Sequence, residues 1–185
     1  MKKTLIIHPE DKSTTFLEVI YKNIPEEQRT LVTGGLTINA VRDLIKSHDR
    51  VMMMGHGSPY GLFSCNKFVG QTRGYIIDHS TVPLLAEKEE NIYIWCNADM
   101  FIKHHQLKGF YSGMFISEID EAYYCGIPGM KQDDIDESNF GFSEILSKFV
   151  NEPKEVIYEN VKKEYSAIAE INPVALYNNN RLFIS

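Results

Sequence analysis

MMMGHG (residues 52–57) and YIWCNAD (residues 93–99) are the two stretches that best indicate how this chain folds. Each is an apolar run that ends in a chemically reactive side chain, His56 in the first and Cys96 in the second. A short, continuous apolar run is typical of a strand buried inside a parallel sheet. The two stretches therefore predict two central strands, one followed by an imidazole and the other by a thiol.

The carboxyl ends of parallel strands form the edge of an α/β sheet where ligands bind. His56 and Cys96 both follow their strands directly, and the interval between them fits one crossover unit, so we expect adjacent strands. An imidazole can take the proton of a nearby thiol and make it nucleophilic. The N–H groups of Gly57 and Cys96 could then stabilise an oxyanion. The structural alternative is that the cysteine is a small buried hydrophobic residue and that the His-Gly pair is incidental.

The remainder of the chain alternates apolar runs with amphipathic stretches, which is typical of α/β proteins. Strands are expected at residues 4–7, 29–33, 51–54, 92–95 and 113–117, with a hairpin at 61–68. Helices are expected at residues 14–22 (capped by Ser13), 37–48, 82–89, 98–105, 119–124, 139–150 and 156–169. A long loop is expected at residues 126–137, and an edge strand or hairpin at 173–177 and 182–184. We predict one α/β domain over residues 1–185, a three-layer α/β/α sandwich with a mostly parallel central sheet.

Charge and hydropathy argue against several classes of partner. The formal net charge is −6, and no basic cluster exceeds a pair of lysines, so we expect neither a nucleic-acid nor a membrane-surface partner. No apolar run approaches the roughly 18 residues that a membrane-spanning helix requires.

The cysteine pattern favours a reducing compartment. Cys65, Cys96 and Cys125 are odd in number and contain no CxxC motif, so we expect a cytoplasmic protein without a disulfide framework. The adjacent His104 and His105 would point to different faces of a helix, and the sequence has no second ligand cluster, so we expect no metal site. We also expect no cofactor.

These stretches, in this order, resemble the clan CD cysteine peptidases, the caspase-like fold that includes CHAT domains, separase, gingipains and clostripain. In that group an apolar strand ends in His-Gly and a later apolar strand ends in the catalytic cysteine. GHGS (residues 55–58) is similar to the first element and IYIWCNAD (residues 92–99) to the second, although Trp95 departs from the residue usual before the cysteine. GMFISEIDEA (residues 113–122) is similar to a CHAT-type strand that leads into an acidic helix.

The resemblance implies a caspase-like sandwich in which His56 is the general base and acid and Cys96 is the nucleophile. It also implies an oxyanion hole formed by the amides of Gly57 and Cys96. The residues that it implies for the wall of the substrate side-chain pocket are Ser117, Glu118 and Asp120. Acidic side chains there would favour an Arg or Lys side chain by charge pairing. Capping of the following helix and compensation of its dipole are the alternative roles for these carboxylates.

Three functions remain open from the sequence. The first is a cysteine endopeptidase that cleaves a protein or peptide through an acyl-enzyme, with a basic residue before the cleaved bond as one option; bacterial relatives of this kind act in regulated cleavage, defence or maturation of a partner. The second is a catalytically inactive caspase-like interaction module, acting with a protein partner or as a homodimer. The third, ranked lower, is a small-molecule amidase or thioesterase that uses the same dyad.

Overall fold

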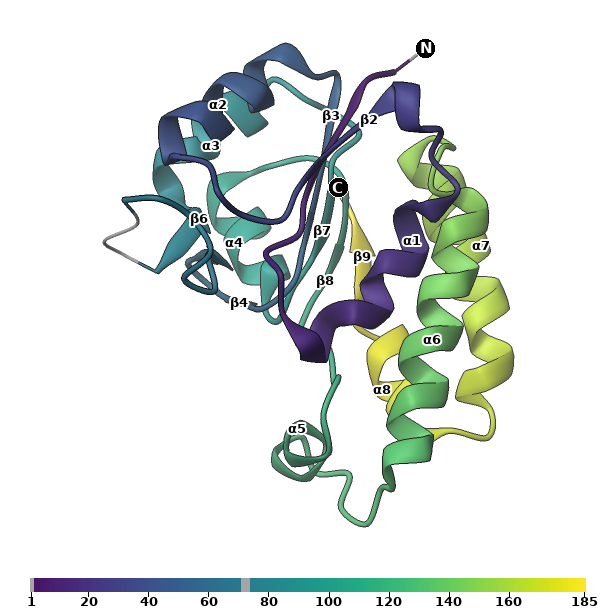
Figure 1. Cartoon of the computed structure of the whole chain (residues 1–185). Helices are drawn as coiled ribbons and strands as arrows, with labels where there is room; N and C mark the ends of the chain where they lie inside the picture. The colour runs from purple at the N-terminus through teal and green to yellow at the C-terminus, as the bar shows by residue number, and fades with distance from the viewer. Residues whose placement is uncertain (1, 71–73) are drawn as a thin grey trace.

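A six-stranded sheet runs through the centre of the molecule (Figure 1). The computed structural model describes residues 2–70 and 74–185. In spatial order the strands are β2 (Arg29–Val32), β1 (Thr4–Ile7), β3 (Arg50–Met54), β7 (Ile92–Ile94), β8 (Phe110–Ser112) and β9 (Leu182–Ile184). The first five are parallel, and β9 pairs antiparallel with β8. This confirms the predicted α/β fold with a mostly parallel sheet.

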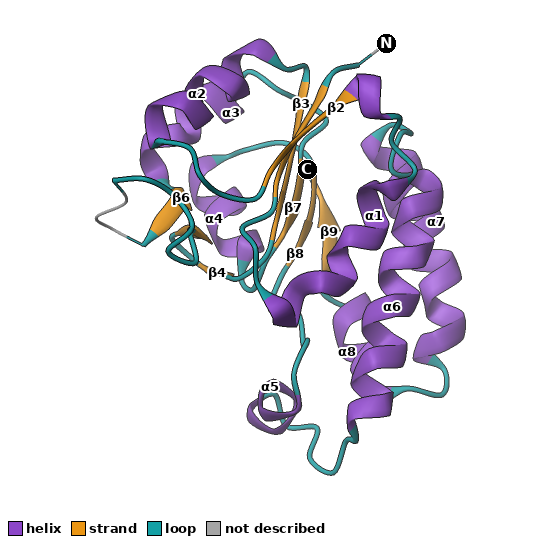
Figure 2. Cartoon of the chain, in the orientation of Figure 1, coloured by secondary structure: helices purple, strands orange, loops and turns teal. Residues whose placement is uncertain are grey.

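Helices cover both faces of the sheet, which gives three layers (Figure 2). One face carries α2 (Ile38–Ser47), α3 (Val82–Leu85) and α4 (Ala98–His105). The other face carries α1 (Glu18–Lys22), α6 (Gln132–Phe149) and α7 (Lys154–Ala169). The short α8 (Pro173–Asn179) packs against α6 and α7, and the short α5 (Ile119–Tyr124) lies beyond the edge of the sheet.

The apolar run of β3 is continuous because both faces of this strand are buried. Val51 and Met53 pack in the core on the α2 side, whereas Met52 and Met54 pack in the core on the α6 side. All four side chains are fully buried. Burial of a side chain of this size contributes about 1.5–3 kcal/mol, so β3 is well anchored and fixes the position of the residues that follow it.

A small antiparallel sheet follows β3 directly. It consists of β4 (Gly57–Ser58), β5 (Gly61–Phe63) and β6 (Tyr75–Ile77). The predicted hairpin at 61–68 is therefore shifted: its first half is β5, which pairs with β4 and β6. Gly61 has a φ of +141°, and a Cβ at this position would lie 1.9 Å from the Ile77 carbonyl oxygen. The close approach of β6 requires glycine here.

The prediction of a strand at residues 113–117 is wrong. The strand is β8, which ends at Ser112, and residues 113–117 form a loop. Gly113 makes the last bond of the β8–β9 ladder, because its N–H donates to the Arg181 carbonyl oxygen (2.7 Å), and its own carbonyl accepts the N–H of Asn97 (3.1 Å). The apolar side chains of Phe115 and Ile116 are buried, but they pack beneath helices.

The predictions for residues 173–177 and 126–137 are also wrong. Residues 173–177 are helical, not extended: the Asn172 side chain accepts the N–H groups of Val174 and Ala175, and Pro173 occupies the first turn of α8. The expected loop 126–137 ends early because α6 begins at Gln132. The Asp134 carboxylate accepts the Lys131 N–H (2.8 Å) at this helix start.

The remaining differences concern helix ends. The helix predicted at 82–89 ends at Leu85. The helix predicted at 14–22 begins as a 3₁₀ turn, η1 (Lys12–Leu17), and its cap is Asp11, not the predicted Ser13. Among the described residues, no helix combines the length and apolarity needed to cross a bilayer.

Candidate functional site

Two adjacent parallel strands bring His56 and Cys96 to one edge of the sheet. β3 and β7 pair in register, with Met52 opposite Ile92. His56 is the second residue after β3, and Cys96 is the second residue after β7. The prediction that these two strands are neighbours is confirmed, and both reactive residues lie beyond carboxyl ends.

The two side chains line one small cavity of about 20 Å³. Its other lining residues are Thr14, Phe16, Leu17, Gly55, Ile94, Trp95, Phe115 and Ser117. A larger open groove of about 300 Å³ shares Phe16 and Ser117 with it. The groove therefore begins next to the pair, where it offers room for a substrate group.

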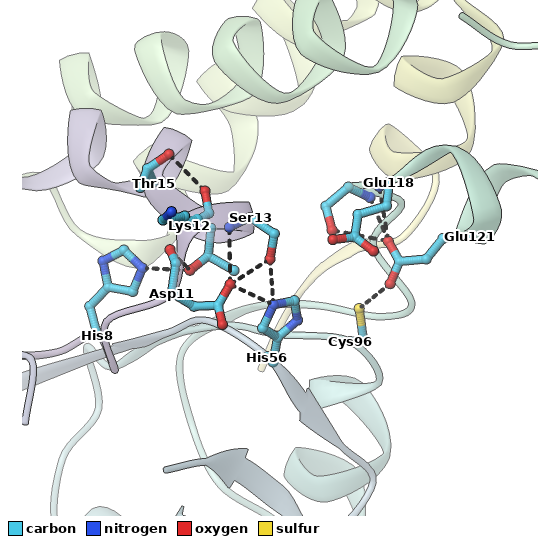
Figure 3. A network of polar contacts seen from close by, with 11 residues as sticks. His8, Asp11, Lys12, Ser13, Thr15, His56, Cys96, Glu118 and Glu121 are labelled. Atoms are coloured by element: carbon cyan, nitrogen blue, oxygen red, sulfur yellow. Dashed lines mark hydrogen bonds and ion pairs between the residues drawn. The ribbon is translucent and has the colours of Figure 1, made fainter. Parts of the chain in front are cut away.

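His56 is held on one side by the turn that begins η1. Its Nε2 lies 2.6 Å from Ser13 Oγ and 3.5 Å from Asp11 Oδ1 (Figure 3). Nδ1 has no hydrogen-bond partner among the described residues. Sequence reasoning missed both partners, because Ser13 was interpreted as a helix cap and Asp11 carried no motif.

Cys96 makes its contacts with another segment. Its thiol donates to the Phe115 carbonyl oxygen (3.3 Å) and lies 3.7 Å from Glu121 Oε1. In Figure 3 the sulfur points toward Glu121, and His56 lies between Cys96 and the Asp11–Ser13 turn. Burial, followed by the Glu121 charge, raises the pKa of the Cys96 thiol to about 12. In this state the thiol is protonated, so it is not yet a nucleophile.

Glu121 is a functional candidate that sequence reasoning did not single out. Its Oε2 accepts the Ser117 N–H (2.7 Å), the Ser117 hydroxyl (3.0 Å) and the Glu118 N–H (3.2 Å). The bond from the Glu118 N–H belongs to the capping box of α5, and the three bonds together leave Oε1 facing Cys96. The cap residue is Glu118, so the usual Ser/Thr signature of a capping box is absent from the sequence.

The three residues predicted to bind substrate lie in different places. Ser117 lines both the cavity and the groove, and Glu118 lines the groove. Asp120 is exposed in the first turn of α5. It does not belong to the described residues that line the cavity or the groove. Two further groove residues, Asp136 and Asn139, come from α6. Asp136 was hidden by the loop prediction for this segment.

Gly57 lies where close packing excludes any side chain. A Cβ at this position would lie 2.2 Å from Cδ1 of Trp95, whose indole N–H donates to the Ser58 carbonyl oxygen (3.1 Å). The Trp95 ring thus fixes the backbone that follows His56. Within the described part of the chain, the Cys96 N–H has no hydrogen-bond partner.

His104 and His105 lie in the last turn of α4. His104 and His105 pack ring against ring, with centroids 4.6 Å apart. Across residues 2–70 and 74–185, no group of three or more His, Cys, Asp or Glu side chains is arranged to hold a metal ion.

No protein-family model matches this chain, and no curated protein matches it significantly in sequence.

Proposed function

We propose that this protein is a caspase-like cysteine hydrolase that cleaves a peptide bond in a protein or peptide through an acyl-enzyme on Cys96. The observation that carries the proposal is the delivery of His56 and Cys96 by adjacent strands to one cavity at the carboxyl edge of the sheet. The resemblance of GHGS and IYIWCNAD to the two catalytic elements of that fold supports it.

The proposed reaction has two steps. The Cys96 proton passes to the His56 ring while the sulfur attacks the substrate carbonyl carbon, and the ring then gives the proton to the leaving amine. Water, deprotonated by the same ring, attacks the thioester carbonyl carbon. The C–S bond then breaks, the acid is released, and the Cys96 thiolate takes the proton back from the ring. The N–H groups of Cys96 and Gly57 are the proposed donors to the oxyanion.

The contact between Cys96 and Glu121 sets a condition on this reaction. The thiol must leave the Glu121 carboxylate and turn toward His56 before its proton can move. Catalytic contacts of apo proteins often tighten only when substrate binds. We therefore assign the described geometry to the resting state of the enzyme.

The charges in the groove next to the dyad favour a substrate with a basic side chain. Two carboxylates, Glu118 and Asp136, line it against a single ammonium, that of Lys12. A guanidinium or ammonium group would pair with these carboxylates.

The second candidate function is an inactive interaction module of the same fold. The specific observation that favours it is the protonated, partly buried thiol beside a carboxylate.

Peptide hydrolysis with the Cys96→Ala variant separates the two functions. Incubation with a mixture of peptides derived from a denatured proteome should give cleavage by the wild type and by Cys65→Ser, and none by Cys96→Ala. A peptidyl electrophile should label the same two proteins only. A folded wild-type protein that neither cleaves nor becomes labelled would favour the interaction module.

A further inference from the structure

The turn before η1 fixes the direction of a hydrogen-bond chain that ends at His56. Asp11 Oδ1 accepts the Ser13 N–H (3.0 Å) and lies 2.8 Å from Ser13 Oγ (Figure 3). The Ser13 bonds lower the pKa of Asp11, so this side chain is a carboxylate at neutral pH and can only accept. The single hydroxyl hydrogen of Ser13 is thus directed to Asp11.

The hydrogen bond between Ser13 and His56 can then run in only one direction. Ser13 Oγ lies 2.6 Å from His56 Nε2, and its hydrogen is already used. A bond at this distance needs a hydrogen between the two atoms, so Nε2 must carry it. The reverse direction would place the lone pairs of Ser13 Oγ against the Asp11 carboxylate. The chain therefore runs from His56 through Ser13 to Asp11, and Oδ1, 3.5 Å from Nε2, faces the same ring nitrogen.

We propose that Ser13 and Asp11 are positioning residues that hold neutral His56 as its Nε2–H tautomer, which leaves Nδ1 as the atom that accepts the Cys96 proton. Nδ1 has no partner among the described residues, and the ring lines the same cavity as Cys96. The tautomer follows from the hydrogen-bond chain alone. The role of Nδ1 as a base rests on the proposed function. Asp11 also offers a negative charge to the imidazolium that forms when the thiol loses its proton.

Nitrogen-15 NMR of the histidine rings near neutral pH tests the tautomer without any assay of activity. In the wild type we expect a protonated signal at His56 Nε2 and an unprotonated signal at Nδ1. Ser13→Ala should give a mixture of tautomers, and Ser13→Thr, which keeps the hydroxyl, should restore the wild-type pattern. Thr15→Ala, in the same 3₁₀ turn but away from His56, should leave the His56 signals unchanged. A wild-type ring protonated at Nδ1 would overturn the proposal.

Kinetics then test the role of the chain in catalysis. Asp11→Ser retains a residue able to cap η1 but removes the charge. We expect Asp11→Ser and Ser13→Ala to lower kcat about 10- to 100-fold with KM nearly unchanged, which is part of the contribution usual for general base catalysis. An unchanged kcat would overturn the positioning role in catalysis. If the wild type has no activity, the proposed function fails while the tautomer result still stands.

Discussion

At the level of single residues, Cys96 is held in a state that suppresses its reactivity. Its sulfur contacts the carboxylate of Glu121, and this charge adds to the effect of burial on the thiol pKa. The carboxylate itself is fixed by Ser117 and by the backbone of Glu118, so it does not swing freely away. Removal of the Glu121 charge should therefore make the Cys96 thiol more reactive.

Glu121→Gln should lower the pKa of Cys96 from about 12 and speed its alkylation by iodoacetamide at a fixed pH above neutrality. Each unit of fall gives about tenfold more thiolate. The rate is measured by mass spectrometry of the Cys96 peptide. Glu118→Gln alters the same capping box without a contact to the sulfur, and it serves as the matched control. Equal alkylation rates in the two variants would contradict the role given to Glu121.

His8 should make folding stability depend on pH. It is buried between Tyr21 and Thr14, and burial lowers its pKa from 6.5 to about 4. The unfolded chain takes up this proton below about pH 6.5 and the folded protein only near pH 4. Stability is therefore full above pH 6.5 and falls between pH 6.5 and 4, by about 3 kcal/mol from this residue. Urea unfolding should show that the free energy of unfolding declines less steeply with falling pH in His8→Gln than in the wild type. Parallel pH profiles of the two proteins would refute this prediction.

At the level of elements, the loop that contacts Cys96 is positioned by α8. The side chain of Asn178 accepts the Ile116 N–H (2.7 Å) and donates to the Ile116 carbonyl oxygen (2.9 Å), as a neighbouring strand would. Asn178 is fully buried. This amide therefore fixes the segment on which Phe115 and Ser117 reach the site.

Asn178→Ala should destabilise the protein by about 2 kcal/mol or more, because it leaves the buried N–H and C=O of Ile116 without partners. Asn180→Ala changes an exposed asparagine at the end of the same helix and should have little effect. Thermal or urea unfolding measures both. A loss of stability at Asn178 no larger than that at Asn180 would show that α8 does not hold the loop.

Elements with a strong local pattern were predictable from the sequence. The strand 4–7 and the helix 98–105 lie at the predicted residues. One error arose where distant contacts decide the outcome, and another where a local helix-start signal was missed. The apolar run at 113–117 looks like a strand, yet the sheet ends at Gly113 and Ile116 pairs with a side chain. The stretch 173–177 looks extended, yet Asn172 and Pro173 start a helix there.

At the level of the whole molecule, the sheet topology brings together residues that are far apart in sequence. The two apolar runs predicted their own adjacency, because one crossover unit places successive parallel strands side by side. The residues that contact His56 and Cys96 could not be predicted in this way. Ser13 and Glu121 reach His56 and Cys96 from other segments, and only the packed structure shows these contacts.

In the proposed mechanism, Cys96 becomes a nucleophile when a substrate occupies the groove. The most direct measurement is the site of covalent attachment of a peptidyl electrophile with a basic residue next to its reactive group, mapped by mass spectrometry on wild type, His56→Ala and Cys65→Ser. We expect attachment to Cys96 in the wild type and in Cys65→Ser, with a large loss of labelling in His56→Ala. Labelling that avoids Cys96, or that proceeds equally well without His56, would contradict the account.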